Sequence, residues 1–369
     1  MEFVSDLATL RLCSGLASLG FAFVFLSLWG GRRGEAHWLH WASSSALYAA
    51  VLAGFQFATS PAVEAVLYGV LAATNLQILM GVRRFDGLPA LRPWMGLPVL
   101  AAMLAYGLPA LTLADAGLAS TASRIGGTVG LAASMGVVGT LLVFGRGPTP
   151  SRGRRIAGAA LYTFLPVYAA AIAAEAAGWS SPNMAALLPM IADQLLLTML
   201  NLGLLAMPGE RAQAALREAA LRDGLTGAWN RAGLDAHASR AIAADTALVV
   251  IDVDHFKAIN DRHGHAAGDR VLAAVVTAAG ALLPTRRDFV ARLGGDEFVV
   301  VLHGTDLLAA RRVADGIGAA ARRSRGLPPW TLSLGVAMVE ANDAGLAEGL
   351  ARADAALYRA KASGRDRAA

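Results

Sequence analysis

The chain is poor in cysteine and in charged residues. Its 369 residues include a single cysteine, Cys13, which excludes an internal disulfide framework and a cysteine-ligated zinc site. Only 16% of the residues are charged and 56% are hydrophobic, with a mean hydropathy of +0.50. Such a composition is too apolar for an ordinary soluble protein. Acids are scarcest in the first 207 residues, which contain Glu2, Asp6, Glu35, Glu64, Asp86, Asp115, Glu175 and Asp193.

This acid-poor half consists of hydrophobic runs, each close to the roughly 20 residues that a helix needs to cross a bilayer. After Pro208, acids and bases alternate densely, as they do on a soluble surface. The pattern therefore predicts an all-α membrane bundle of about seven spans, followed by a globular α/β domain. The runs lie near 8–30, 38–58, 62–82, 94–114, 124–144, 156–177 and 184–207.

Arginine placement predicts the orientation of these spans. The connections after the first, third and fifth runs carry arginine, whereas "TSPAVE", "LADAGLAST" and "GWSSPN" carry none. By the positive-inside rule the N-terminus is then outside, and the C-terminal half is on the cytoplasmic side of the inner membrane. The acidic start "MEFVSD" argues against a cleaved signal peptide. The arginines are Arg32, Arg33, Arg83, Arg84, Arg92, Arg146, Arg152, Arg154 and Arg155.

The net charge of +5 raises the question of a nucleic-acid partner. Most of the excess arginine lies in the predicted cytoplasmic connections, where it sets topology and meets anionic lipid. We therefore expect membrane lipid as a partner and no nucleic acid. Asp193, near the middle of the last run, is either a ligand-sensing or pairing group or a helix-packing contact, because acids at membrane depth serve all of these roles.

A helical connector is predicted between the two halves. The segment "MPGERAQAALREAALRD" is rich in alanine, leucine, glutamate and arginine. Its roughly two heptads suit either a short parallel contact between two copies of the chain or a solvated linker. The predicted organisation is a membrane sensor domain over 1–207, the connector over 208–222 and a catalytic domain over 223–369.

The last part alternates strands and helices. "DTALVVIDVD" and "WTLSLGVAMVE" are typical of buried strands, and "DFVARLGGDEFVVVLHG" predicts two strands around a two-residue turn at Gly294 and Gly295. "AAGDRVLAAVVTAAGALL", "TDLLAARRVADGIGAAARR" and "GLAEGLARADAALYRAKASGR" have helical periodicity. These elements predict a mixed central sheet with helices on its faces.

Acidic residues mark two strand ends of this sheet. Asp252 ends one strand and Asp296 lies at the hairpin tip, so the two carboxylates converge if the strands are neighbours. Converging oxygen ligands suit Mg²⁺, which leaves other coordination positions to phosphate and water. "DRHGHAAGD" supplies polar groups where a loop enters a helix. Lys361 and Arg365, one predicted helical turn apart, offer cations to a polyphosphate. The combination indicates nucleotidyl or phosphoryl transfer with two metal ions.

Five sequence blocks, in order, resemble the GGDEF domain, the diguanylate cyclase module that condenses two GTP molecules into cyclic di-GMP and pyrophosphate. The resemblance implies a fold similar to adenylyl cyclase catalytic domains and polymerase palms. It covers the chain from about Asp223 to Arg367. The blocks are "DGLTGAWNR", "IDVDHFKAINDRHGHAAGD", "RLGGDEF", "LSLGVA" and "ADAALYRAKASGRDR".

The resemblance implies a metal site and a catalytic group. Asp252, the Val253 carbonyl and Asp296 would bind two Mg²⁺ or Mn²⁺ ions in each GTP site. Asp296 would also be the candidate base for the attacking 3′-hydroxyl. Glu297 completes the signature and would share in metal binding.

The resemblance also implies contacts with GTP. Asn260 and Asp269 would hydrogen-bond the guanine, with His265 between them as a further contact. Phe256 and Lys257 would line the triphosphate, and Lys257 would oppose the charge that develops at the α-phosphorus.

Further along the chain, the resemblance implies that Lys361 and Arg365 hold the β- and γ-phosphates. Gly294 and Gly295 would leave room for the nucleotide to approach the backbone. Because each domain holds one GTP, two copies must face each other, and a homodimer through the connector and the GGDEF domains is expected.

One departure concerns product inhibition. Many members of this family carry an inhibitory Arg-x-x-Asp site five residues before the glycine pair, and this chain has Thr285 to Asp288 there. Losing a bidentate arginine predicts weak or absent inhibition. Two other functions stay open: a catalytically silent domain that acts as a nucleotide-binding membrane receptor, and a transport or sensing protein with a regulatory cytoplasmic half.

Overall fold

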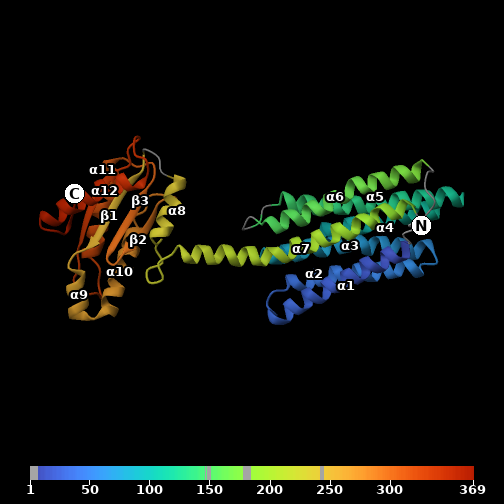
Figure 1. Cartoon of the computed structure of the whole chain (residues 1–369), viewed down its shortest axis with the longest axis horizontal. Coiled ribbons are helices and arrows are strands. Elements are labelled where there is room, and N and C mark those ends of the chain that lie inside the picture. The colour runs from blue at the N-terminus through green and yellow to red at the C-terminus, as the bar shows by residue number, and fades with distance from the viewer. Residues whose placement is uncertain (1–6, 146, 148–150, 178–183, 242–244) are drawn as a thin grey trace, which may run out of the picture. The chain divides into compact units, whose positions relative to one another are not determined.

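The computed structural model describes residues 7–145, 147, 151–177, 184–241 and 245–369. The chain divides into two compact units, Met1–Gln213 and Ala214–Ala369 (Figure 1). The finer boundaries predicted at residues 207 and 222 stay a prediction.

The first unit is helical, and each predicted hydrophobic run coincides with one of its long helices. Within the described part of the chain, six helices are long and apolar enough to cross a membrane. The seventh long helix, α2, has 21 residues but is not among these six. Its first nine residues, "HWLHWASSS", include two histidines and three serines and so lower its hydropathy. The helices are α1 (Leu7–Gly31), α2 (His37–Phe57), α3 (Pro61–Phe85), η1 (Pro93–Met95), α4 (Gly96–Thr112), α5 (Ala116–Val143), α6 (Arg152–Ala176) and α7 (Met184–Ala220).

Small residues let these helices approach one another closely. A Cβ atom added to Gly153 of α6 would lie 2.3 Å from the carbonyl oxygen of Gly203 in α7. Only glycine therefore fits at this crossing, as is common between helices that pack in a membrane.

The arginines at one end of the bundle are used differently from the prediction. Arg154 was expected in a loop facing lipid, but it lies in the first turn of α6 and is buried. Its Nη1 atom lies 2.9 Å from Oδ2 of Asp86, at the end of α3. Arg211 of α7 approaches Asp86 at 3.6 Å and stacks over the ring of Phe85, with 3.4 Å from its Cζ atom to the ring centroid. These arginines therefore tie helix ends together.

The connector is helical, as predicted, but it is not separate from the last hydrophobic run. Helix α7 continues from Met184 to Ala220 and includes Pro189 and Pro208. The backbone of Arg152 and Gly153, at the start of α6, donates to the Glu210 carboxylate at 2.9 and 3.1 Å. Glu210 thus caps α6 from within α7.

The second unit is a five-stranded sheet in the order β2-β3-β1-β4-β5. Strands β1, β3, β2 and β4 pair antiparallel to their neighbours, and β4 pairs parallel to β5, which confirms the predicted mixed sheet. The elements are α8 (Arg231–Ala241), β1 (Ala247–Val253), α9 (Phe256–His263), α10 (His265–Gly280), β2 (Phe289–Gly294), β3 (Glu297–Leu302), α11 (Leu307–Arg322), β4 (Leu332–Met338), α12 (Leu346–Ala362) and β5 (Arg367–Ala368).

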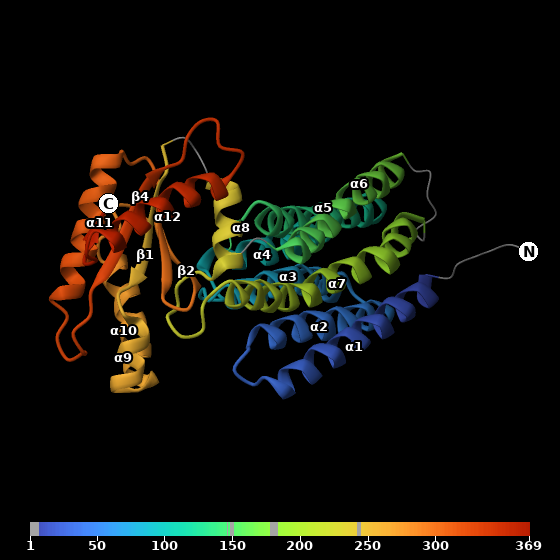
Figure 2. The same ribbon diagram turned by 60° about the vertical axis from the view of Figure 1, so that its left-hand side comes forward.

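Helices cover both faces of this sheet (Figure 2). Val249 and Ile251 of β1 pack in one core with residues of α9, α10 and α11. Leu248 and Val250 pack in the other core with residues of α8 and α12. Every residue of β1 is buried, because successive side chains of a strand point to opposite faces.

Two details of the second unit differ from the prediction. The hairpin turn consists of Gly295 and Asp296, since β2 extends through Gly294 after a register shift. Gly295 has a φ of +53°, which glycine adopts without strain. Helix α12 ends at Ala362, so Arg365 lies in the turn beyond the helix and not one helical turn after Lys361.

Candidate functional site

The pairing of β1 with β3 brings the strand-end acids together. Asp252 lies directly opposite Glu297 in the antiparallel register, so both side chains leave the sheet on the same face. The backbone N–H of Val253 donates to the carbonyl of Asp296 at 3.4 Å. The backbone of Asp296 therefore lies beside the end of β1, and the convergence of the Asp252 and Asp296 carboxylates stays a prediction. Asp252 is buried, whereas Glu297 is exposed.

Lys361 supplies the positive charge nearest to this pair. Its Nζ atom lies 2.7 Å from Oδ2 of Asp252. Burial raises the pKa of Asp252; the hydrogen bond and charge of Lys361 act in the opposite direction, and Asp296 and Asp254 reinforce the rise. The Asp252 carboxylate thus already binds one cationic group, the Lys361 ammonium.

Asp254 is a third acid at this edge, and the sequence prediction overlooked it. Its carboxylate accepts hydrogen bonds from the hydroxyls of Thr331 and Ser333, both at 2.7 Å, and from the backbone N–H of Asp366 at 3.1 Å. Nε of Arg365 lies 4.0 Å away. Asp254 therefore joins β1 to the start of β4 and to the turn after α12. The sequence feature that could have identified Asp254 is its position two residues after Asp252, directly after the end of β1.

The donor set of this edge fits a divalent cation that also binds phosphate. Across the described ranges, no three His, Cys, Asp or Glu side chains cluster closely enough to hold a metal ion by themselves. Mg²⁺ in nucleotide sites is held by one or two carboxylates, with phosphate and water as the other ligands. Asp252, Asp296 and the Val253 carbonyl would supply such a partial set. The Lys361 ammonium against Asp252 shows that this position accepts positive charge.

The predicted guanine contacts lie on α9 and α10. Oδ1 of Asn260 is buried and has no hydrogen-bond partner among the described residues. A Cβ atom added to Gly268 would lie 1.9 Å from this oxygen, so Asn260 rests against the backbone directly before Asp269. Asp269 and His265 are exposed on the first turns of α10. Asn260 thus has a buried oxygen without a partner next to the exposed Asp269 among the described residues, and their contact with guanine stays a prediction.

The predicted triphosphate contacts lie at the start of α9. His255 precedes the helix with a φ of +56°, an uncommon conformation for a residue other than glycine. Phe256 packs against the core beneath, and Lys257 is exposed. The strand β1 thus leads from Asp252 through a sharp turn to the N-terminus of α9, and helix N-termini favour anions.

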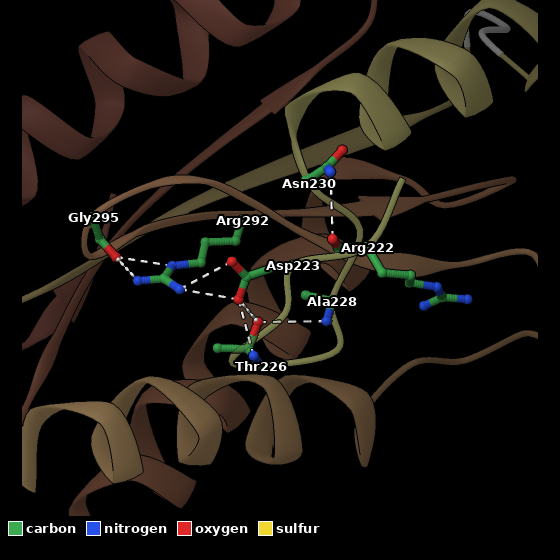
Figure 3. Close-up of polar contacts among 7 residues, drawn as sticks. All are labelled: Arg222, Asp223, Thr226, Ala228, Asn230, Arg292 and Gly295. Carbon is green, nitrogen blue, oxygen red and sulfur yellow. Dashed lines mark hydrogen bonds and ion pairs between the residues drawn. The ribbon is translucent and has the colours of Figure 1, made fainter. Parts of the chain in front are cut away.

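A second network, which the sequence prediction did not identify, supports the hairpin (Figure 3). Nη1 of Arg292 lies 3.0 and 3.1 Å from the two carboxylate oxygens of Asp223. Its Nε and Nη2 atoms donate to the carbonyl of Gly295 at 3.0 and 2.7 Å. Burial raises the pKa of Asp223, but hydrogen bonds from Thr226 and Arg292 outweigh it and leave this pKa below its usual range.

The Arg292 network fixes the glycine turn to the segment that follows α7. The Thr226 hydroxyl and backbone N–H both donate to Asp223, at 2.6 and 2.9 Å. Asn230 completes the segment as the N-cap of α8, accepting from Gly233 N at 2.9 Å.

In the Thr285–Asp288 segment, the Asp288 side chain is already hydrogen-bonded within the protein. Asp288 is buried, and its two carboxylate oxygens accept from Thr285 N at 2.7 Å and from His303 N at 2.8 Å. Arg286 and Arg287 are exposed. Asp288 therefore already has backbone partners on both oxygens.

Comparison with known proteins identifies the second unit. Residues 220–367 match the family described as "Diguanylate cyclase, GGDEF domain". Diguanylate cyclase DgcP of Pseudomonas aeruginosa is 45% identical over 164 residues, which are 41% of this chain and 24% of that protein, so the chain spans about a quarter of the length of this relative.

Two further relatives are matched by this chain over most of their own length. An uncharacterized 19.3 kDa protein of Streptomyces ambofaciens is 38% identical over 149 residues, which are 40% of this chain and 81% of that protein. The coiled coil and GGDEF domain of DgcB from Caulobacter crescentus, solved with c-di-GMP, is 31% identical, covers 43% of this chain and 90% of that one, and has a TM-score of 0.40.

Proposed function

Because this chain belongs to the GGDEF family of diguanylate cyclases, we propose that it condenses two GTP molecules into cyclic di-GMP and two pyrophosphates. The observation that carries this proposal is the pairing of β1 with β3, which places Asp296 beside the strand end that carries Asp252, with Lys361 against Asp252. In each half-reaction, a 3′-oxygen forms a bond to an α-phosphorus while the bond to the departing pyrophosphate breaks.

The proposed metal ions are two Mg²⁺ or Mn²⁺ ions in each GTP site. The Asp252 and Asp296 carboxylates and the Val253 carbonyl would hold them, and the exposed Glu297 would share in their binding. Bound divalent ions supply charge neutralisation at the phosphates and at the attacking oxygen.

The residues around this site have separate proposed tasks in catalysis. Asp296, in the turn, accepts the proton of the 3′-hydroxyl. Lys257 stands at the start of α9, where it opposes the charge developing at the α-phosphorus. Lys361 and Arg365 bind the β- and γ-phosphates, and Lys361 must then exchange the Asp252 carboxylate for phosphate. Phe256, which packs against the core at the start of α9, lines the triphosphate position.

Guanine recognition rests on α9 and α10. The unpartnered Asn260 carbonyl and the exposed Asp269 accept from the N–H groups of the base, and His265 is the further contact between them. A site built from groups that hydrogen-bond guanine discriminates strongly against bases without those donors, because its own polar atoms would be left unpaired. Gly294 and Gly295 leave the neighbouring space clear for the nucleotide.

Two chains are needed for this reaction, because one GTP site supplies only one half of the ring. Leu216 of α7 is 71% exposed in the single chain, and it lies on the part of α7 that follows the predicted spans. Pairing of two α7 helices there would cover this side chain. We therefore assign homodimerisation to the connector and the GGDEF domains.

The first unit is the proposed sensor, placed in the inner membrane with the N-terminus outside and in contact with anionic lipid at its arginine-bearing end. Because α7 runs unbroken from the bundle through Ala220, a movement of its first turns reaches the connector. Glu210 and Arg211 attach α7 to the ends of α6 and α3. Changes in bundle packing would therefore alter the position of the connector helix, which gates the meeting of two half-sites.

Product inhibition is proposed to be weak. Thr285 replaces the arginine that would bind the product, and both Asp288 oxygens are engaged by backbone N–H groups. A product guanine would have to displace these contacts, each worth about 1 kcal/mol or more for a charged acceptor.

The test is turnover by the full chain in detergent with GTP and Mg²⁺, followed as cyclic di-GMP and pyrophosphate formation. Asp296→Asn should remove product at unchanged expression. Asp315→Asn, an equivalent change at an exposed position of α11, should leave the rate unaltered. Nucleotide binding without product in the unaltered protein would instead support a silent receptor, and full activity of Asp296→Asn would exclude the catalytic assignment.

A further inference from the structure

A large cavity lies inside the helical bundle of the first unit, independent of the nucleotide site. Its volume is about 410 Å³, and all seven long helices contribute to its lining. This volume falls in the range of small-molecule sites, roughly 300–1,000 Å³. The contributing segments are the beginnings of α1, α3, α5 and α7 and the later turns of α2, α4 and α6. The cavity thus occupies the end of the bundle that holds the start of α1, which is the outer end in the proposed orientation.

Most charged groups of this cavity are matched within the protein. Arg124 of α5 forms an ion pair with Glu175 of α6, with 2.8 Å between its Nε atom and the carboxylate. Glu64 of α3 accepts a hydrogen bond from the Tyr106 hydroxyl, and Arg11 of α1 lies within its electrostatic range. Arg124 and Arg11 therefore each lie near a carboxylate other than Asp193.

Asp193 of α7 is the carboxylate left over. It lines the cavity and is only 3% exposed. The hydroxyls of Ser14 and Tyr48 lie at its carboxyl group, yet its Oδ2 atom has no hydrogen-bond partner among the described residues. No lysine, arginine or histidine in the described ranges forms an ion pair with it. A buried carboxylate without a counter-ion is costly, so the cavity favours an added positive charge.

Aromatic side chains surround this carboxylate. Tyr48 and Tyr168 lie within electrostatic range of Asp193, and the Phe164 ring stacks on Tyr168 with 6.0 Å between centroids. All three line the cavity. Aromatic faces carry negative potential and attract organic cations, and they also bury apolar groups.

We propose that this cavity binds a small organic amine, with its protonated amino group on Asp193 and its apolar or aromatic body against Tyr48, Phe164 and Tyr168. The amino group would give Asp193 the counter-ion that it lacks among the described residues. An alkali ion would satisfy the charge but not the apolar part of the lining, and the volume exceeds what one ion and its first water shell require.

The position of Asp193 connects this site with the rest of the chain. It lies on α7, about five turns before the part of the helix that Glu210 and Arg211 fix to α6 and α3. A ligand on Asp193 would shift the equilibrium of α7 only to the extent that it binds one arrangement more tightly than another. Binding itself is measurable without cyclase activity, so the proposal stands apart from the proposed reaction.

The first test compares three probes on the unaltered full chain in detergent by isothermal titration calorimetry. The probes are 2-phenylethylamine, which is cationic at pH 7, the neutral 2-phenylethanol and the anionic 3-phenylpropanoate. The amine should bind saturably, at least about tenfold more tightly than the alcohol, which corresponds to about 1.4 kcal/mol. The anion should bind more weakly than both.

The second test uses Asp193→Asn, which keeps the side-chain shape and removes its charge. The amine should lose its advantage over the alcohol. Glu35→Gln is the matched control, because Glu35 lies between α1 and α2 at the other end of the bundle, on Trp38 Nε1. This variant should bind the amine as the unaltered chain does.

The outcomes decide the proposal even if Asp193→Asn does not fold, since the probe comparison needs no variant. Equal binding of amine and alcohol would mean that a neutral carboxyl or water fills the site, and the proposal would be wrong. Absence of amine binding at millimolar concentration, or full displacement of the amine by sodium ions at similar concentration, would overturn it as well.

Discussion

The sharpest structural prediction concerns Arg292, which joins the segment after α7 to the glycine turn. In Arg292→Met the side chain keeps an apolar stem but loses the guanidinium, and with it two contacts to the Asp223 carboxylate and two to the Gly295 carbonyl. Hydrogen bonds to charged groups contribute about 1.5–3 kcal/mol net. The two side chains are 15% and 22% exposed, so solvent screening places the expected loss near the lower end, about 2 kcal/mol.

This loss should be local and measurable by hydrogen exchange on the full chain. Thr226 N donates to the Asp223 side chain and Gly227 N to its carbonyl, each at 2.9 Å. If Arg292 holds this turn closed, both amides should exchange about 30-fold faster in Arg292→Met. Cyclase activity should fall with it, because the Gly295 carbonyl is no longer fixed beside Asp296.

Two further variants separate the ion pair from a general loss of charge. Asp223→Asn should accelerate exchange comparably, and the double variant should add little, since the two residues share one interaction. Arg311→Met, at an exposed position of α11, should change neither exchange nor activity. Unchanged exchange at residues 226 and 227 in Arg292→Met would refute the reasoning.

Three other predictions follow from the site. Gly268→Ala should displace the Asn260 side chain, whose Oδ1 atom lies 1.9 Å from the added Cβ position. The KM for GTP should then rise at least about tenfold, and the preference for GTP over ATP should fall. The thermal unfolding temperature should stay nearly unchanged. Thr285→Arg should create sensitivity to added cyclic di-GMP if the missing arginine is the cause of weak inhibition, and initial rates with and without product would show it. The pKa of Asp223 is lowered, so its ion pair is fully present above the usual carboxyl range and is lost as the pH falls through this lowered pKa. Opening of the turn, measured by exchange at residue 226, should therefore not increase between about pH 7 and 5. It should increase only below about pH 4.

The division of the chain and the mixed sheet could be predicted from the sequence because each rests on local patterns. Apolar runs of bilayer length stand out against the acid-rich remainder, and the strands carry continuous β-branched residues. The acids at strand ends are also visible in the sequence, and the prediction that they converge requires β1 and β3 to be neighbours. The pairing in the structure confirms that neighbourhood.

The contacts that support the site were not predictable in the same way. Arg292 and Asp223 are 69 residues apart, and no local pattern joins them. Asp86 and Arg154, which are 68 residues apart, likewise follow no shared local pattern, whereas the fold joins them in an ion pair. The position of Arg365 beyond α12 depended on where the helix stops, and helix ends are the least certain part of a sequence-based assignment.

The cavity around Asp193 shows a similar limit. The sequence identified one acid in an apolar run but left its role between sensing and packing. Only the packed bundle shows that Arg124 is matched by Glu175 and that Asp193 has an unpartnered oxygen facing a cavity.

The most direct measurement of the central claim is the anomalous scattering of Mn²⁺ in a crystal of the protein with a non-hydrolysable GTP analogue. We predict anomalous density within metal–ligand distance of both the Asp252 and Asp296 carboxylates, next to the nucleotide phosphates and with Lys361 moved from Asp252 to phosphate. A bound nucleotide without ion density between these two side chains, or with Lys361 still on Asp252, would contradict the account.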